Sequence, residues 1–244
     1  MTARERADRL LVARGLFESR AKAQAAIAAG RVTADGAPVR KPSDEIARDA
    51  EIAAEPAFAW VSRGGVKLAH ALDQLGLSVE GRVCLDVGAS TGGFTEVLIG
   101  RGARRVFAVD VGRDQLHPSL RGRPEIVSIE ATDIRMLDLA VLEQRPEIVT
   151  VDVSFISLKQ VLPSALALPA PRATLVALIK PQFEVGKGRA LKKGIVRDPD
   201  VHAAVCTDIA TFVAGLGWEV LATFPSPIAG GDGNSEFLIG AQRG

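Results

Sequence analysis

Four charged residues lie at or near the ends of apolar runs that predict strands, where side chains from distant parts of a chain can meet. They are Lys67, Asp152, Lys180 and Glu236. A lysine accepts a proton only when it is neutral, and burial or a second cation nearby favours that form. Lys180 close to Lys67 could therefore accept or steer the proton of an attacking hydroxyl. The carboxylates would orient the lysines and balance their charge, whereas any one of the four alone is better explained as a surface ion pair.

The direction of the last strand decides whether these residues can meet. Asp152 and Lys180 end predicted strands, whereas Glu236 begins one, directly after the glycine-rich turn 229–234. In a mostly parallel sheet, an antiparallel last strand begins at the edge where the parallel strands end. We therefore expect all four groups at the carboxyl edge of the sheet, beside the ligand that binds there.

A glycine-rich loop follows the first strand of the predicted sheet. A dinucleotide-binding loop would have a second glycine where Ser90 stands, and no P-loop lysine follows, so a phosphate cradle is disfavoured. S-adenosylmethionine is the alternative ligand for such a loop in a doubly wound α/β sheet, and it carries an ammonium, a carboxylate and a sulfonium. The loop residues predicted to hold it are Gly88, Ala89, Ser90, Thr91, Gly92, Gly93 and Phe94.

Three aspartates extend this predicted cofactor site. Asp86 enters the loop and would meet the ammonium directly or through water, while loop amides at the helix start take the carboxylate. Asp110 ends the next strand, 24 residues after Asp86, near the spacing at which a carboxylate binds ribose hydroxyls. Asp133 is expected to end the third strand, where adenine would lie. Asp110 and Asp133 would then lie at corresponding ends of the next two strands. We therefore interpret the loop as a binding site for the methyl donor, rather than as a turn that merely connects a strand to a helix.

The elements that would position these residues alternate between strands and helices, as in a doubly wound, Rossmann-like α/β sheet. Seven strands of a mostly parallel sheet are predicted at 82–86, 105–110, 126–130, 148–152, 175–180, 219–224 and 236–240. Helices are predicted at 91–101, 133–143, 158–168 and 199–216. This domain is expected to span 60–244.

The first 59 residues, including a linker at 53–59, predict a separate small α+β domain. Two helical patterns, the second over 20–29 with Ser19 as its cap, precede a short strand at 31–33 and a turn at 35–36. Residues 1–31 hold seven basic and three acidic side chains, although the net charge of the whole chain is only +1. Cations on helix faces can meet phosphates. We expect RNA contacts from Arg4, Arg6, Arg20, Lys22 and Arg31.

A second basic segment follows Lys180. Residues 185–197 hold five basic side chains and no acidic one, with three glycines among them. Solvated lysines would explain this composition, but its place beside the predicted active site favours RNA binding. The phosphate contacts predicted here are Lys187, Arg189, Lys192 and Lys193.

Composition argues against several other classes of protein. Hydrophobic residues make up 47% and charged residues 24% of the 244 residues, as in an ordinary soluble protein. The amino terminus lacks the apolar stretch of a secretory signal, and the most apolar candidate for a membrane span, 161–179, contains three prolines and an arginine. The two cysteines and three histidines show no metal-binding spacing. We expect a cytoplasmic protein with no metal and no membrane segment.

Short motifs across nearly the whole chain carry a family resemblance. They are FESRAKA (17–23), IAAGRV (27–32), SRGGVKL (62–68), LDVGASTGGFT (85–95), DVSFISL (152–158), IKPQFE (179–184) and GNSEF (233–237). The chain resembles the TlyA-type family, which joins an S4 RNA-binding domain to an FtsJ-like methyltransferase domain and is often labelled hemolysin. The resemblance implies a class I methyltransferase fold and methylation of cytidine 2′-hydroxyls in ribosomal RNA. It also makes the four charged residues above the family's K-D-K-E tetrad, although Ser90-Thr91 replaces the Ala-Pro common in FtsJ-like enzymes.

Three other functions remain as alternatives. The first is a membrane-lytic hemolysin, which neither a spanning segment nor an amphipathic stretch rich in large apolar residues supports. The second is an RNA base methyltransferase, in which residues 152–155 hold a flipped base and Lys180 is incidental. The third is a noncatalytic ribosome-assembly factor that uses only the S4-like domain.

Overall fold

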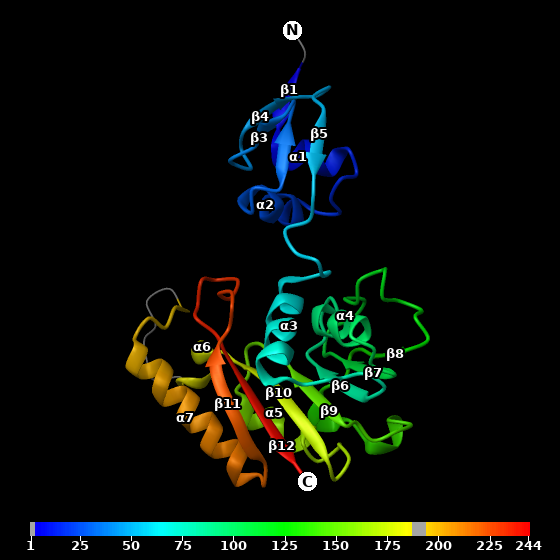
Figure 1. Ribbon diagram of the computed structural model, residues 1–244, viewed down its shortest axis with the longest axis vertical. Coiled ribbons are helices and arrows are strands. Elements are labelled where there is room, and N and C mark those ends of the chain that lie inside the picture. The colour runs from blue at the N-terminus through cyan, green and yellow to red at the C-terminus, as the bar shows by residue number, and fades with distance from the viewer. Residues whose placement is uncertain (1–2, 187–193) are drawn as a thin grey trace. The chain divides into compact units, whose positions relative to one another are not determined.

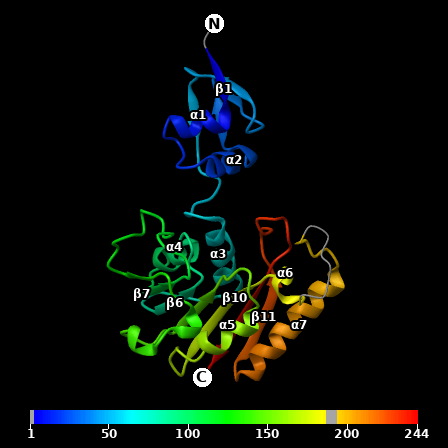
Figure 2. The same cartoon turned by 180° about the vertical axis from the view of Figure 1, so that it is seen from behind.

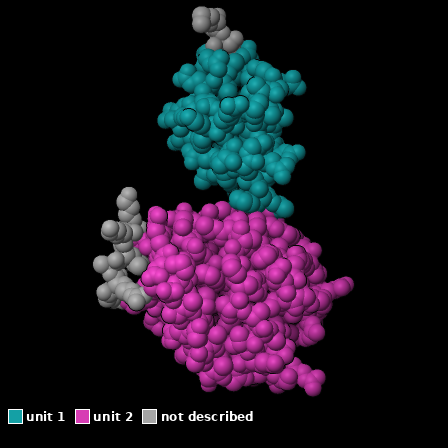
Figure 3. Space-filling model, turned by 60° about the vertical axis from the view of Figure 1, so that its left-hand side comes forward, with its two compact units in different colours: residues 1–59 teal, residues 60–244 magenta. Residues whose placement is uncertain are grey.

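The computed structural model describes residues 3–186 and 194–244 of the chain (Figure 1). Two compact units are present, Met1–Ala59 and Trp60–Gly244, which Figure 3 shows in different colours. The predicted RNA contacts of the second basic segment, Lys187, Arg189, Lys192 and Lys193, lie outside the described residues.

The N-terminal unit combines two short helices with short antiparallel strands. Helix α1 (Ala7–Ala13) and helix α2 (Arg20–Ala28) pack their apolar faces together around Leu11 and Ile27. The Ser19 side chain caps α2 by accepting the N–H of Lys22 at 3.3 Å, as the sequence predicts. The strands are β1 (Arg4–Arg6), β2 (Val32–Ala34), β3 (Ala37–Pro38), β4 (Glu45–Ala47) and β5 (Ile52–Ala54).

Strand pairing closes this small unit. β1 pairs with β4, and β2 pairs with both β3 and β5, all antiparallel. Sequence periodicity predicts the two helices, and the turn at 35–36 indicates β2. β1, β4 and β5 are missed because three residues are too few to show an alternating pattern. β5 therefore takes the first residues of the segment that was expected to be a linker.

The larger unit contains a seven-stranded, mostly parallel sheet within the described residues. In spatial order the strands are β11 (Glu219–Pro225), β12 (Phe237–Arg243), β10 (Ala173–Ile179), β9 (Ile148–Val151), β6 (Val83–Val87), β7 (Arg105–Val109) and β8 (Ile126–Ile129). β12 runs antiparallel to both of its neighbours, whereas the strands from β10 to β8 are parallel. The expectation that the last strand reverses is confirmed.

Helices cover both faces of this sheet. The helices α3 (Arg63–Leu75) and α4 (Gly93–Gly100) lie on one face, and α5 (Leu158–Ala165) and α7 (Pro199–Gly215) lie on the other (Figures 1 and 2). Alternate residues of a strand point to opposite faces, so Leu85 and Val87 of β6 belong to the core under α5, and Cys84 belongs to the core under α3. The predicted doubly wound α/β architecture is confirmed.

Two differences from the predicted elements concern helices. The helix predicted at 133–143 is wrong, since this segment forms two 3₁₀ turns, η1 (Ile134–Met136) and η2 (Leu139–Val141). Asp133 and Asp138 each accept the N–H two residues further on, a local bond that competes with α-helix formation. The helices α3 and α6 (Pro181–Glu184) were not predicted.

Helix α3 begins with glycines, which disfavour helix formation and hide it from propensity-based prediction. Close packing explains one of them. A Cβ atom on Gly65 would lie 2.4 Å from the Trp60 ring, so a larger residue would displace the tryptophan. This packing fixes the start of the helix that carries Lys67.

Candidate active site

Two ion pairs lie at the carboxyl edge of the sheet, and they are formed by the four residues that were predicted to converge. Lys67 of α3 pairs with Glu236, which directly precedes β12, and the two side chains are 8% and 4% exposed. The Nζ of Lys180, directly after β10, lies 2.6 Å from Oδ1 of Asp152, directly after β9. Parallel β9 and β10 together with reversed β12 therefore bring all four groups to one edge.

The surroundings of Lys180 add a hydroxyl to this arrangement. Its Nζ donates a hydrogen bond of 2.8 Å to the Oγ of Ser154, and its side chain is only 10% exposed. Both lysines line the same cavity, yet each has a carboxylate partner of its own. The two carboxylates therefore balance the two lysines pairwise, which is the arrangement that the sequence predicted for them.

The cavity beside these pairs has a volume of about 270 Å³ and is bordered by the glycine-rich loop. Close approaches within the loop require glycine at two positions. A Cβ atom on Gly88, whose φ is +83°, would lie 2.4 Å from the carbonyl oxygen of Asp152, and one on Gly93 would lie 2.0 Å from the Oγ of Ser62. The lining residues are Ser62, Arg63, Gly64, Lys67, Gly88, Ala89, Ser90, Thr91, Gly93, Phe94, Asp152, Ser154 and Lys180.

Helix α4 begins in this loop and offers donors for an anion. Its N-cap is Gly92, and no side chain caps the helix. In the described part of the chain, no acceptor takes the N–H groups of Gly93 and Phe94, and both residues line the cavity. Unpaired N–H groups at a helix start, together with the helix dipole, suit a carboxylate ligand. Gly92 itself does not line the cavity but lies against Leu116 and Leu120.

Asp86 is placed differently from the prediction. It is fully buried under the loop, where its carboxylate accepts hydrogen bonds from Thr95 Oγ1 at 2.7 Å and from Thr150 Oγ1 at 3.0 Å. Burial raises the pKa of Asp86 to about 7, although the two hydroxyls oppose this shift. Because Asp86 does not line the cavity, the direct contact with a ligand ammonium is not available. Its observed contacts join α4 to β9.

The other two predicted aspartates lie outside the cavity lining. Asp110 follows β7 and accepts the N–H groups of Ser90 at 2.8 Å and Gly112 at 2.7 Å, which ties the cofactor loop to the end of the next strand. Asp133 does not end the third strand, because β8 stops at Ile129. Hydrogen bonds from Arg135, with which Asp133 forms an ion pair of 2.6 Å, lower the pKa of Asp133.

Sequence reasoning missed several residues at this edge. Ser62, Arg63, Gly64 and Ser154 line the cavity, and they belong to motifs in which only Lys67 and Asp152 were given a role in ribose methylation. Phe155 follows Ser154 with a φ of +65° and is 91% exposed, while its ring lies 5.2 Å from that of Phe183. An exposed phenylalanine in the left-handed region is strained and places an apolar ring in water, so Phe155 is a candidate for contact with a ligand.

The predicted RNA contacts of the N-terminal unit lie beside acceptors of the same unit. Arg6 and Arg20 both bind Asp8, whereas Arg4 donates to the backbone carbonyl of Glu45. Two more are ion pairs on the surface, Lys22 with Glu18 and Arg31 with Glu55. All five keep substantial exposure, so they remain available to a polyanion.

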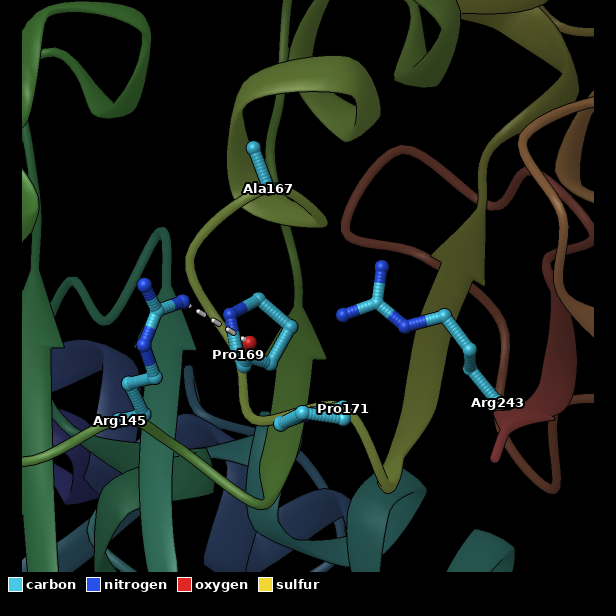
Figure 4. Close-up of a pocket in the computed structure, with 5 residues that line it drawn as sticks. All are labelled: Arg145, Ala167, Pro169, Pro171 and Arg243. Atoms are coloured by element: carbon cyan, nitrogen blue, oxygen red, sulfur yellow. Dashed lines mark hydrogen bonds between the residues drawn. The ribbon is translucent and has the colours of Figure 1, made fainter.

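A larger cavity, about 590 Å³ in volume, lies at the opposite edge of the sheet, where β10 begins and β12 ends. Figure 4 shows the guanidinium groups of Arg145 and Arg243 on either side of Pro169. Ala167 and Pro171 complete the lining. No carboxylate or hydroxyl side chain is among these lining residues, so this cavity offers no group for proton transfer.

Comparison with known proteins identifies the fold and the family. Residues 60–243 match the FtsJ-like methyltransferase model, and residues 5–52 match the S4 domain. The chain belongs to the FtsJ-like methyltransferase family. A solved structure of a putative hemolysin from Streptococcus thermophilus is similar, with a TM-score of 0.78 and 38% sequence identity. The superposition covers 100% of this chain and 90% of the hemolysin chain. The predicted family and the predicted fold are confirmed.

Curated relatives cover nearly the whole methyltransferase. It is 44% identical over 241 residues to the 16S/23S rRNA (cytidine-2'-O)-methyltransferase TlyA of Mycobacterium tuberculosis. The aligned residues cover 98% of this chain and 90% of the relative. It is also 44% identical over 238 residues to the putative rRNA methyltransferase YqxC of Bacillus subtilis, 97% of this chain and 85% of that one. Within residues 3–186 and 194–244, no helix has the length and apolar character required to cross a membrane.

Proposed function

We propose that this methyltransferase transfers the methyl group of S-adenosylmethionine to the ribose 2′-hydroxyl of a cytidine in ribosomal RNA. The observation that carries the proposal is that two ion pairs, Lys67–Glu236 and Lys180–Asp152, lie beside one cavity bordered by a glycine-rich loop. The names of the curated relatives supply the cytidine and the ribosomal RNA.

The residues around the loop fit the cofactor. Gly88 and Gly93 pack against Asp152 and Ser62 with no room for a Cβ atom, which holds the loop close to two residues that line the cavity. The N–H groups of Gly93 and Phe94 suit the carboxylate of an amino acid. Asp110, which accepts the N–H of Ser90 in the loop, is the carboxylate proposed to bind the ribose hydroxyls of the cofactor. When bound, S-adenosylmethionine supplies an electrophilic methyl group.

The four charged residues then prepare the hydroxyl for attack. In its neutral amine form, Lys180 Nζ, held between Asp152 and Ser154, orients the 2′-hydroxyl and accepts its proton as the methyl group is transferred. The ammonium formed in this step is the form that pairs with Asp152, and it returns to the amine by releasing the proton to solvent. Glu236 fixes Lys67, which lines the same cavity, and the Lys67 ammonium limits the positions that the incoming oxygen can occupy. The contribution of the protein is orientation together with removal of one proton.

Three parts of the chain are proposed to hold the RNA. The S4 unit presents Arg4, Arg6, Arg20, Lys22 and Arg31 to phosphates. Phe155, next to the active-site residue Ser154, offers an exposed ring on which the base of the target nucleotide can stack. The second basic segment, with Lys187, Arg189, Lys192 and Lys193, is proposed as a third contact on the strength of its composition.

The test is transfer of labelled methyl groups from S-adenosylmethionine to isolated bacterial ribosomal subunits and to their purified RNA. A 2′-O-methyl group removes the nucleophile of alkaline cleavage, so we expect one alkali-resistant phosphodiester at each modified cytidine. A labelled product that stays fully sensitive to alkali would instead show base methylation and overturn the ribose assignment. Binding to RNA without any transfer would favour a noncatalytic assembly factor.

A further inference from the structure

A buried carboxylate in the N-terminal unit holds two of the arginines that are proposed to contact RNA. Asp8, in the first turn of α1, has no exposed surface. Its Oδ1 accepts from Arg6 Nε at 3.1 Å, and its Oδ2 accepts from Arg6 Nη2 at 3.2 Å and from Arg20 Nη2 at 2.6 Å. Gln24 of α2 donates to the same Oδ2 at 2.8 Å. One carboxylate thus joins β1, α1 and α2.

The geometry of these bonds leaves one end of each arginine available. Arg6 and Arg20 both approach Asp8 through Nε and Nη2, and no acceptor in the described part of the chain takes their Nη1 groups. Their side chains remain 40% and 49% exposed, whereas Asp8 is completely covered. With two cations on one anion, the cluster carries a net positive charge, and its arginine side chains reach solvent whereas the carboxylate does not.

The carboxylate keeps its charge across the physiological range. The hydrogen bonds from Arg6, supported by those from Arg20 and Gln24, hold the pKa of Asp8 far below its usual value. An ionised partner fixes both arginines permanently, so their rotamer freedom is already lost before a ligand arrives. Binding then costs less conformational entropy than it does at the exposed pair Arg31–Glu55, where both side chains are more than half exposed.

We propose that Asp8 is a positioning residue that presents Arg6 and Arg20 as a two-pronged site for an RNA backbone phosphate. The inference rests on the proposed RNA binding by the S4 unit. It predicts that the loss of one negative charge lowers the affinity for RNA. Removal of an acidic charge from a protein normally strengthens its binding to a polyanion, but removal of the Asp8 charge weakens it, because both arginines lose their fixed geometry.

The experiment compares two variants that change the net charge by the same amount. Asp8→Asn removes the buried carboxylate, and Glu5→Gln removes the partner of Arg48 on the same unit. Binding of the full chain to end-labelled 16S and 23S ribosomal RNA is measured over a range of KCl concentrations. We expect about tenfold weaker binding for Asp8→Asn, and unchanged or tighter binding for Glu5→Gln. Binding by Asp8→Asn that equals or exceeds the wild type overturns the inference.

Further measurements separate positioning from simple loss of the fold. Thermal unfolding shows whether the Asp8→Asn unit stays folded, and a positioning role raises KM for RNA while kcat for methyl transfer stays near the wild-type value. Gln24→Leu retains every charge and loosens the carboxylate, so we expect a smaller weakening in the same direction. If Gln24→Leu binds RNA as tightly as the wild type, the carboxylate does not need its support and the inference fails.

The arginine variants distinguish this inference from the function on which it rests. Arg20→Ala should weaken RNA binding and reduce the salt dependence by about one phosphate contact. In the double variant Asp8→Asn/Arg20→Ala, the second change should add little, since both act through one contact. If Arg6→Ala and Arg20→Ala both bind RNA like the wild type, RNA binding by this surface is itself wrong. If they weaken binding and Asp8→Asn does not, only the positioning role is wrong.

Discussion

The ammonium of Lys67 and the carboxylate of Glu236, 169 residues apart in the chain, form an ion pair that is almost completely buried at the carboxyl edge of the sheet. The pair exists because α3 starts the larger unit and reversed β12 ends it. Gly230 lies so close that a Cβ atom there would be 2.5 Å from Glu236 Oε1, so a larger residue at this position would displace the carboxylate. The reversal of one strand therefore connects the two ends of this unit within the active site.

Glu236→Gln should impair both stability and methyl transfer. The change leaves the Lys67 ammonium buried without its counter-charge, which costs about 3–5 kcal/mol when one partner of a buried pair is removed. Loss of the fixed orientation of Lys67 should also lower kcat by roughly a hundredfold. Chemical denaturation and single-turnover methyl transfer measure the two effects. Glu219→Gln, on exposed β11, is the control and should change neither. A fully active Glu236→Gln would contradict the role given to this pair.

Lys180→Met should abolish most of the turnover while leaving cofactor binding nearly intact. Its Nζ is the group that both contacts Asp152 and Ser154 and lines the cavity, so the variant removes the proton acceptor and keeps the shape of the side chain. A general base contributes about 10²–10⁴-fold to a rate, and a fall in kcat within this range is expected. Equilibrium binding of S-adenosylmethionine provides the control. Lys180→Arg should be equally slow, because arginine keeps the charge but does not give up its proton.

Sequence patterns predict the sheet of this protein better than its small elements. Strand runs such as Val83–Val87 are buried on both faces and are therefore apolar apart from Asp86. The alternation of such runs with helices leaves few possible topologies. The helix predicted at 133–143 failed because the side chains of Asp133 and Asp138 bond their own backbone, a local competition that hydrophobic periodicity does not contain. β1 and β4 were missed because three-residue strands carry no pattern.

The active site could be predicted only to the level of strand ends. Residues at the carboxyl edge, such as Asp152 and Lys180, are placed there by topology alone. Topology does not say which lysine pairs with which carboxylate, because that depends on the register of β12 against β10, in which Ile179 lies opposite Phe237. The burial of Asp86 was likewise not predictable, since it depends on hydroxyl partners from α4 and β9 that no spacing rule relates to it.

Phe155→Ala should weaken RNA binding without loss of stability. The ring is 91% exposed and so contributes little to the core, whereas stacking of a base on an aromatic ring contributes about 1–3 kcal/mol, equivalent to roughly five- to 150-fold in KM for RNA. Phe155→Gly relieves the strain of a φ of +65° and should raise the melting temperature while losing the same stacking. A KM that does not change in either variant would show that the base lies elsewhere.

Asp86→Asn should change how the stability of the larger unit depends on pH. Burial raises the folded pKa of Asp86 to about 7 from an ordinary value of 3.8, so the folded state favours the protonated acid. The stability that this group contributes is complete below about pH 4 and is lost as the pH rises through 7. At pH 8 the wild type carries a buried charge, and asparagine never does.

We therefore expect the difference in free energy of unfolding, Asp86→Asn minus wild type, to increase between pH 4 and pH 8. The increase should be on the order of a few kcal/mol. Tryptophan fluorescence during denaturation measures it, because both tryptophans, Trp60 and Trp218, belong to the larger unit. Asp133→Asn is the matched control. Arg135 lowers the pKa of Asp133, so its contribution is retained above pH 4 and is lost only on further acidification. Parallel pH profiles for the wild type and Asp86→Asn would mean that Asp86 is ionised throughout, with its charge satisfied by the hydroxyls of Thr95 and Thr150.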